Sequence, residues 1–128
     1  MMKSTQDLIE EELLRLCAKG GFEAFMLFNE EGIPMATVGQ PTHYDEDAIA
    51  ALSVVLRQFA ELLEDFHVDT IVNETSIRTT NKYRIVSRPF QVEEIDIKLI
   101  LIAIVPQNLS YRKITNKAIQ TVQHIMNN

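Results

Sequence analysis

The sequence offers few side chains that could carry out catalysis or bind a metal ion. Its single cysteine, Cys17, cannot form an internal disulfide or a multi-thiolate site, and its place on an apolar helical stripe predicts a small buried side chain. The histidines His43, His67 and His124 are far apart and lie near expected helix ends or loops. No phosphate-binding glycine loop, nucleophile elbow or zinc-protease motif occurs. These features predict a protein that is not an enzyme and that uses no metal or cofactor.

Two groups of charged residues could do other chemistry. Residues 43–47, His-Tyr-Asp-Glu-Asp, could bind a cation, but their position directly before a helical pattern favours capping of the helix. Arg57 could act as a catalytic arginine offered to a partner. Its i, i+4 spacing to Glu61 instead favours a surface ion pair. We therefore expect structural roles for both groups.

The charge of the chain is unevenly distributed. Residues 1–76 carry 4 Lys/Arg and 15 Asp/Glu, whereas residues 77–128 carry 8 Lys/Arg and 3 Asp/Glu. The two halves can neutralise each other within one fold or across a dimer, or the basic half can offer a patch to an acidic protein partner. Lys82, Arg84 and Arg88 alternate and would share one face of a strand. The net charge of −6 argues against nucleic acid as a general partner.

Hydrophobic periodicity predicts eight secondary-structure elements in a single domain, residues 1–128. In chain order these are a helix from Ser4 or Thr5 to Lys19, strands Phe22–Phe28 and Ile33–Val38, a helix Asp45–Phe66, strands Asp69–Arg78, Lys82–Phe90 and Ile95–Val105, and a helix Leu109–Met126. The first and last strands lack clean alternation of apolar and polar residues, as strands covered on both faces do. This order predicts an α/β three-layer sandwich around one sheet.

The ends and apolar stretches of the chain favour a cytoplasmic protein. The longest uncharged apolar stretch, Leu99–Val105, is too short to span a bilayer, so we expect no direct membrane insertion. Residues 1–12 turn acidic where a signal peptide would need an apolar core.

The second predicted helix is too apolar for one buried face. One stripe is expected to face the sheet: Ile49, Leu52, Leu56, Phe59, Leu63 and Phe66. An adjoining stripe, displaced toward Gln58, consists of Ala51, Val55 and Leu62, and the polar arc consists of Ser53, Arg57, Glu61, Glu64 and Asp65. The two apolar stripes cover roughly half the circumference, where one buried face needs little over about 100°. Either the same chain covers the extra stripe, or it packs against a second copy of the protein.

The strand predicted after this helix could extend such a contact. In Asp69–Arg78, Ile71, Asn73 and Thr75 alternate with their neighbours, and neither Pro nor Lys interrupts pairing at the edge of the sheet. We therefore predict a homodimer. Its expected interface residues are Ala51, Val55, Gln58, Leu62, Ile71 and Asn73.

Several segments resemble the Roadblock / dynein-light-chain family. These are FEAFMLFNEEGIPMATV with its Asn-x-x-Gly turn, the acidic-capped helix DEDAIAALSVVLRQFAELLEDF, the strands DTIVNETSIRT and IDIKLILIAIV, and the helix start PQNLSYRKITNKAI. The resemblance covers nearly the whole chain and is strongest to the MglB-like members of bacteria and archaea. It implies a five-stranded, mostly antiparallel sheet with one helix on one face and two on the other. It also implies a dimer through the second helix and third strand.

Family members of this kind scaffold or regulate small Ras-like GTPases without being GTPases. The resemblance therefore implies a homodimeric, non-catalytic adaptor or regulator with a small Ras-like GTPase as partner. The alternative is a ligand-sensing domain of the PAS or GAF kind, which would need an internal pocket with converging polar groups. The predicted strands offer few such groups.

Overall fold

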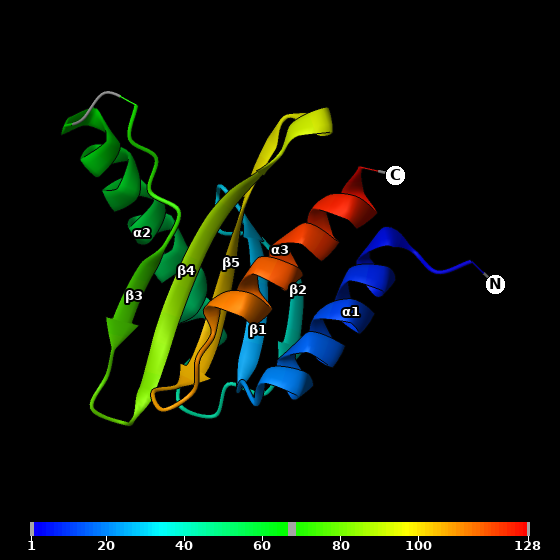
Figure 1. Ribbon diagram of the computed structural model, residues 1–128, viewed down its shortest axis with the longest axis horizontal. Coiled ribbons are helices and arrows are strands. Elements are labelled where there is room, and N and C mark those ends of the chain that lie inside the picture. The colour runs from blue at the N-terminus through cyan, green and yellow to red at the C-terminus, as the bar shows by residue number, and fades with distance from the viewer. Residues whose placement is uncertain (1, 67–68, 128) are drawn as a thin grey trace.

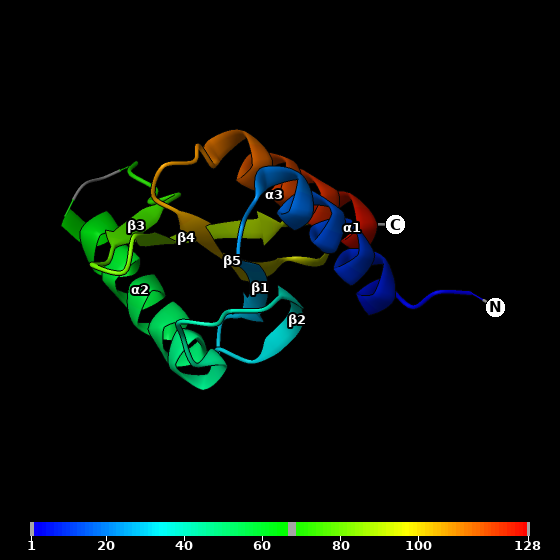
Figure 2. The same cartoon turned by 90° about the horizontal axis from the view of Figure 1, so that it is seen from below.

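The chain folds into three layers, with one β-sheet between helices on both of its faces (Figure 1). The computed structural model describes residues 2–66 and 69–127. Its elements are α1 (Thr5–Gly20), β1 (Ala24–Asn29), β2 (Pro34–Gly39), α2 (Glu46–Phe66), β3 (Thr75–Arg78), β4 (Tyr83–Val92), the 3₁₀ turn η1 (Glu93–Ile95), β5 (Ile97–Pro106) and α3 (Arg112–Met126). Helices α1 and α3 cover one face of the sheet and α2 covers the other (Figure 2). The predicted architecture and order of elements are confirmed.

The sheet has five strands in the order β2-β1-β5-β4-β3, and neighbouring strands are antiparallel. The central strands β1 and β5 are buried on both faces, as their lack of alternation predicts. Successive side chains enter two separate cores. The core under α2 contains Met26, Phe28, Ile100, Ile102 and Ile104. The core under α1 and α3 contains Phe25, Leu27, Leu99, Leu101 and Ala103.

Helix α1 begins and ends with the signals that the sequence predicts. Ser4 Oγ accepts a hydrogen bond from the Asp7 N–H at 3.1 Å, and the Asp7 carboxylate accepts one from the Ser4 N–H, which completes a capping box. Gly21 ends the helix in the left-handed region at φ 71°. Cys17 is buried on this helix, and burial raises the pKa of its thiol.

The third strand is shorter than predicted. Of the expected strand Asp69–Arg78, only Thr75–Arg78 pairs with β4, so the prediction that Ile71 and Asn73 lie within a strand is wrong. In this segment side chains, rather than a neighbouring strand, form hydrogen bonds with the backbone. The Glu64 carboxylate accepts the Val72 N–H at 2.8 Å, and Arg88 Nε donates to the Asn73 carbonyl at 3.0 Å.

Smaller differences occur at other element ends. The first strand begins at Ala24 rather than Phe22, and the last helix begins at Arg112 rather than Leu109. The expected start of the last strand at Ile95 is wrong, because η1 and the left-handed Asp96 (φ 51°) make the turn between β4 and β5. Within the described residues, no helix has both the length and the apolar character needed to cross a membrane.

Candidate functional site: the exposed face of helix α2

Helix α2 packs on the sheet through a narrow stripe that includes small side chains. Its buried residues are Ile49, Ser53, Leu56 and Ala60. Ser53 was expected on the polar arc, yet it is fully buried, and its hydroxyl donates to the Ala50 carbonyl at 2.7 Å. The hydrogen bond removes the cost of burying this hydroxyl. The buried stripe ends at Ala60, well before the helix itself ends.

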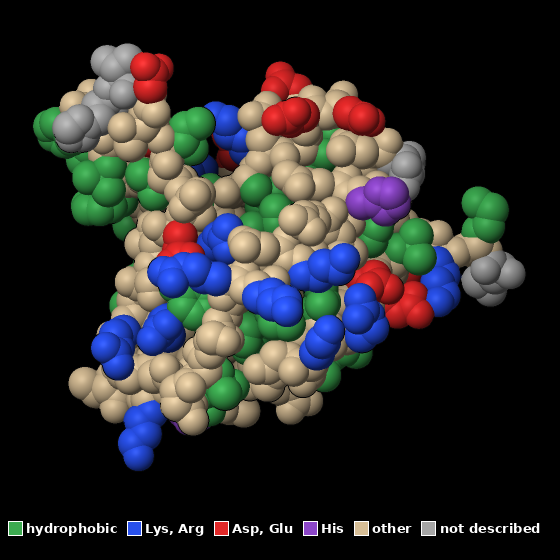
Figure 3. All heavy atoms as spheres, viewed as in Figure 1, with side chains coloured by type: hydrophobic (Ala, Val, Ile, Leu, Met, Phe, Trp, Pro, Cys, Tyr) green, Lys and Arg blue, Asp and Glu red, His purple; other side chains and the backbone are tan. Residues whose placement is uncertain are grey.

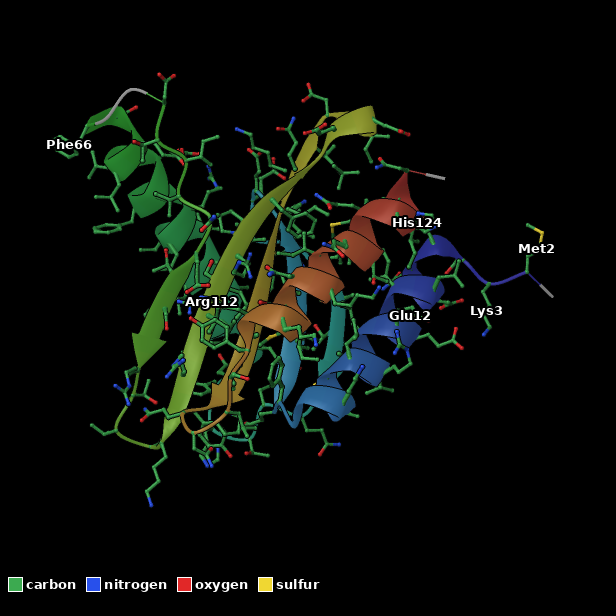
Figure 4. All side chains as sticks on the ribbon, in the orientation of Figure 1. Met2, Lys3, Glu12, Phe66, Arg112 and His124 are labelled. Carbon is green, nitrogen blue, oxygen red and sulfur yellow. The ribbon has the colours of Figure 1, made fainter. Side chains whose placement is uncertain are left out.

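The large apolar residues of α2 mostly point away from the sheet. The predictions that Phe59, Leu63 and Phe66 face the sheet are wrong, because their side chains are 53%, 41% and 73% exposed. Figure 3 shows apolar side chains gathered over the C-terminal half of α2, and Figure 4 shows the labelled Phe66 at the outer end of the helix. A continuous apolar surface of this kind marks an interaction site more often than a free surface.

The residues predicted from the adjoining stripe lie on the exposed part of the same helix. Val55 is 56% and Leu62 53% exposed, and Ala51 and Gln58 are also exposed. The described part of the chain therefore leaves this stripe uncovered. We call the exposed apolar side chains Val55, Phe59, Leu62, Leu63 and Phe66 the α2 apolar face.

Charged groups border the α2 apolar face. Arg57 Nη1 lies 2.7 Å from Glu61 Oε1, which confirms the predicted i, i+4 ion pair. The Arg57 side chain is only 22% exposed, and within residues 2–66 and 69–127 its Nε has no hydrogen-bond partner. The guanidinium is therefore held against the protein by one carboxylate and is not projected toward solvent.

A groove separates the second half of α2 from strands β4 and β5. It has a volume of about 230 Å³ and is lined by Arg57, Ala60, Glu61, Glu64, Ile71, Val72, Pro89, Phe90, Gln91, Lys98, Leu99 and Ile100. Pockets that bury small ligands usually measure about 300–1,000 Å³. The groove is smaller than that, so it gives little support to a ligand-sensing domain. Ile71, which is 83% exposed, forms part of its rim.

The outer edge of β3 adjoins α2 at the end of the sheet. β3 pairs only with β4, so one side of its four residues has no partner among the described strands. Asn73, predicted at the dimer interface, is exposed in the segment directly before this strand. An apolar helix face beside an open strand edge is a surface that can bind another polypeptide.

This arrangement matches several solved structures. MglB from Myxococcus xanthus superimposes with a TM-score of 0.82 at 15% identity, over 99% of this chain and 93% of that one. The gliding protein MglB from Thermus thermophilus gives 0.78 at 11% identity, over 98% and 93%. A Roadblock/LC7 domain from Streptomyces avermitilis gives 0.72 at 11% identity, over 92% and 94%. The chain has the Roadblock/MglB fold.

The likeness to the Roadblock/MglB fold lies in the structure. At the level of sequence, no family model and no curated protein matches the chain. The predicted resemblance to Roadblock domains is confirmed for the fold, including the placement of one helix on one face and two on the other. The predicted dimer interface stays a prediction.

The remaining candidate groups have structural roles in this Roadblock/MglB fold. Asp45 accepts the Ala48 N–H at 3.3 Å, which confirms that the acidic cluster caps α2. His43 Nδ1 lies 3.4 Å from the Glu23 carboxylate. Burial by itself raises the pKa of Glu23, but hydrogen bonds from Thr42 and His43 outweigh it and hold that pKa below its ordinary value. His67 lies outside the described residues.

Sequence reasoning missed part of the exposed surface of the Roadblock/MglB fold. It placed Phe59, Leu63 and Phe66 against the sheet because it gave the largest apolar side chains to the core. The signal that could have found them is the spacing of the small residues Ser53 and Ala60, which continues the stripe of Ile49 and Leu56. Small side chains let a helix approach a sheet closely.

Proposed function

We propose that the protein is a homodimeric, non-catalytic adaptor or regulator of a small Ras-like GTPase in the cytoplasm. The observation that carries this proposal is the α2 apolar face, which the described part of the chain leaves exposed. Five large apolar side chains exposed on one helix indicate a surface that binds another protein, because contiguous apolar patches mark interaction sites.

A second copy of the chain is the expected occupant of part of this face. Closed twofold dimers are the commonest oligomers, and a helix can pack against its own symmetry mate. Val55, Phe59 and Leu62 are each about half exposed. Burying these exposed parts in both copies would contribute on the order of 5–9 kcal/mol. Because association costs about 4–15 kcal/mol, hydrogen bonds along the β3 edge are needed to sustain a dimer.

The GTPase partner is supported by the fold and by the family resemblance. The Roadblock / dynein-light-chain resemblance implies regulation of small Ras-like GTPases, and the chain superimposes on MglB and Roadblock/LC7 structures over nearly its whole length. The α2 apolar face is longer than a contact through Val55 and Leu62 requires. Leu63 and Phe66 extend it beyond that contact and could meet a partner.

Light scattering on a sizing column tests the dimer. The wild-type chain should elute at twice its mass of 14.6 kDa. Leu62→Glu should give a monomer. Leu14→Glu is a matched control, because Leu14 lies on α1 and has the same 53% exposure as Leu62. A wild-type monomer at micromolar concentration, or dissociation by both variants alike, would contradict the proposed interface.

Nucleotide-dependent capture tests the GTPase partner. The immobilised protein should retain small Ras-like GTPases of the same organism in one nucleotide state, GDP or a non-hydrolysable GTP analogue, and not in the other. A hydrolysis assay on the retained GTPase then separates an activator from a scaffold. No binding in either state would contradict the proposed function, whatever the oligomeric state.

A further inference from the structure

Helices α1 and α3 frame a groove with basic side chains on its rim. The groove has a volume of about 410 Å³ and is lined by Arg15, Leu16, Lys19, Lys113, Ile114, Asn116, Lys117 and Gln120. All four of its charged residues are basic and exposed. Figure 3 shows Lys and Arg side chains concentrated over this side of the molecule. Helices α1 and α3 lie on the face of the sheet opposite α2 (Figure 2), so the groove that their side chains line is separate from the α2 apolar face.

The lysines of this groove are not used within the fold. Among residues 2–66 and 69–127, the ammonium groups of Lys19, Lys113 and Lys117 make no ion pair or hydrogen bond. The nearby arginines differ in this respect. Arg88 donates to Thr115 and Asn116, at 2.7 and 2.8 Å, and Arg112 lies 3.5 Å from Glu74. These arginines are therefore structural. Arg15, in the groove itself, already pairs with Glu12 at 2.7 Å, whereas the three lysines remain available to a ligand.

The spacing of the basic residues fits a linear acidic ligand. Arg15 and Lys19 are four residues apart on α1, and Lys113 and Lys117 are four apart on α3, so each pair is separated by about 6 Å along its helix axis. Carboxylates on alternate residues of an extended peptide recur about every 6.6–6.8 Å. One extended acidic segment in the groove can thus meet both pairs.

The shape and charge of the molecule favour such a segment over other anionic partners. Of the apolar residues that line the groove, Leu16 is 1% exposed and Ile114 is half-buried, so neither can insert into a bilayer. An extended peptide can contact the half-buried Ile114. Nucleic acid binding depends on neutralising many phosphates, and the groove offers only four basic side chains.

We propose that the groove between α1 and α3 is a docking site for an acidic, extended segment of a protein partner. Lys19, Lys113 and Lys117 select carboxylates, and the half-buried Ile114 offers an apolar contact to the segment between them. This site lies on the face of the sheet opposite the α2 apolar face.

Fluorescence polarisation with a labelled peptide in which glutamate alternates with serine tests the site. Lys113→Glu combined with Lys117→Glu should weaken binding about tenfold or more, because two attractions become repulsions. The matched control is Lys82→Glu combined with Lys98→Glu, which changes the net charge equally at exposed positions outside the groove. The control should change the affinity by less than about twofold at physiological salt, where the Debye length is about 8 Å.

Three results would overturn the proposal. Equal weakening by both double variants would show attraction to net charge alone. Unchanged binding of a peptide with glutamine in place of glutamate would show that carboxylates are not recognised. Binding to vesicles of phosphatidylserine and phosphatidylcholine that needs Lys113 and Lys117, with no peptide binding, would assign the groove to a membrane instead. Circular dichroism melting curves confirm that each variant folds.

Discussion

The orientation of α2 can be tested by two alanine substitutions three residues apart. Leu56 is 8% exposed and packs under the helix, whereas Phe59 is 53% exposed on the α2 apolar face. The hydrophobic pattern alone puts both side chains against the sheet. The structure puts only Leu56 there, so the two variants should differ in their free energies of unfolding.

The expected sizes of the two effects follow from burial. Leu56→Ala removes a nearly buried side chain and leaves a cavity, which should lower the free energy of unfolding by about 2–5 kcal/mol. Phe59→Ala loses only the contacts of a half-buried ring, so its cost should stay below about 1.5 kcal/mol in the monomer. Although phenylalanine is the larger residue, its replacement should be the milder one.

Urea unfolding at several protein concentrations provides the assay. With a dependence on urea of about 2 kcal/mol per molar, Leu56→Ala should lower the midpoint by about 1–2.5 M at every concentration. The effect of Phe59→Ala should grow with protein concentration, because it also weakens the proposed dimer. If Phe59→Ala costs as much as Leu56→Ala at the lowest workable concentration, an α2 that turns Phe59 away from the sheet is refuted.

Three further predictions concern single residues. Gly39→Ala should lower stability by more than about 1 kcal/mol, because φ is +82° and the new Cβ would collide with the Glu23 carbonyl oxygen. In thermal melts Gly20→Ala should have a smaller effect, since only the Phe22 ring obstructs it. The fold lowers the pKa of Glu23. The ionised carboxylate therefore stabilises the protein at pH values above the pKa it has in the unfolded chain, and this stabilisation is lost as the pH falls through the folded pKa. Glu23→Gln should therefore flatten the acid side of the stability–pH curve from urea unfolding, and an unchanged curve would contradict this. Burial raises the pKa of the Cys17 thiol, so a thiol reagent should modify it only after unfolding, and rapid labelling of the native protein would contradict its burial.

The sequence was sufficient for the two central strands and for the start of α1, because their signals are local. Unbroken apolar runs predicted β1 and β5 as central strands, and the capping box of Ser4 and Asp7 predicted the start of α1. Each of these signals depends on residues close together in the chain. The order of elements then left few ways to cover both faces of one sheet.

The length of β3 and the orientation of α2 depend on contacts distant in sequence. Arg88 reaches the Asn73 carbonyl from 15 residues away and helps to hold the segment before β3 out of the ladder. No local pattern contains that contact. On α2, side-chain size decides which stripe meets the sheet. A prediction based on hydrophobicity alone buries Phe59 and exposes Ser53. The sequence therefore predicted an uncovered apolar stripe on α2 but underestimated how much apolar surface this helix exposes.

The two edges of the sheet differ in a way that bears on how far assembly can proceed. β2 begins with Pro34, which has no N–H to donate, and α1 packs against this strand. If two copies join along β3, the joined sheet is bounded at both ends by β2. A third copy then finds an edge strand that begins with a proline and is less suited to pairing than β3. Strand addition at β3 would therefore favour a closed pair of copies over continued growth along the sheet.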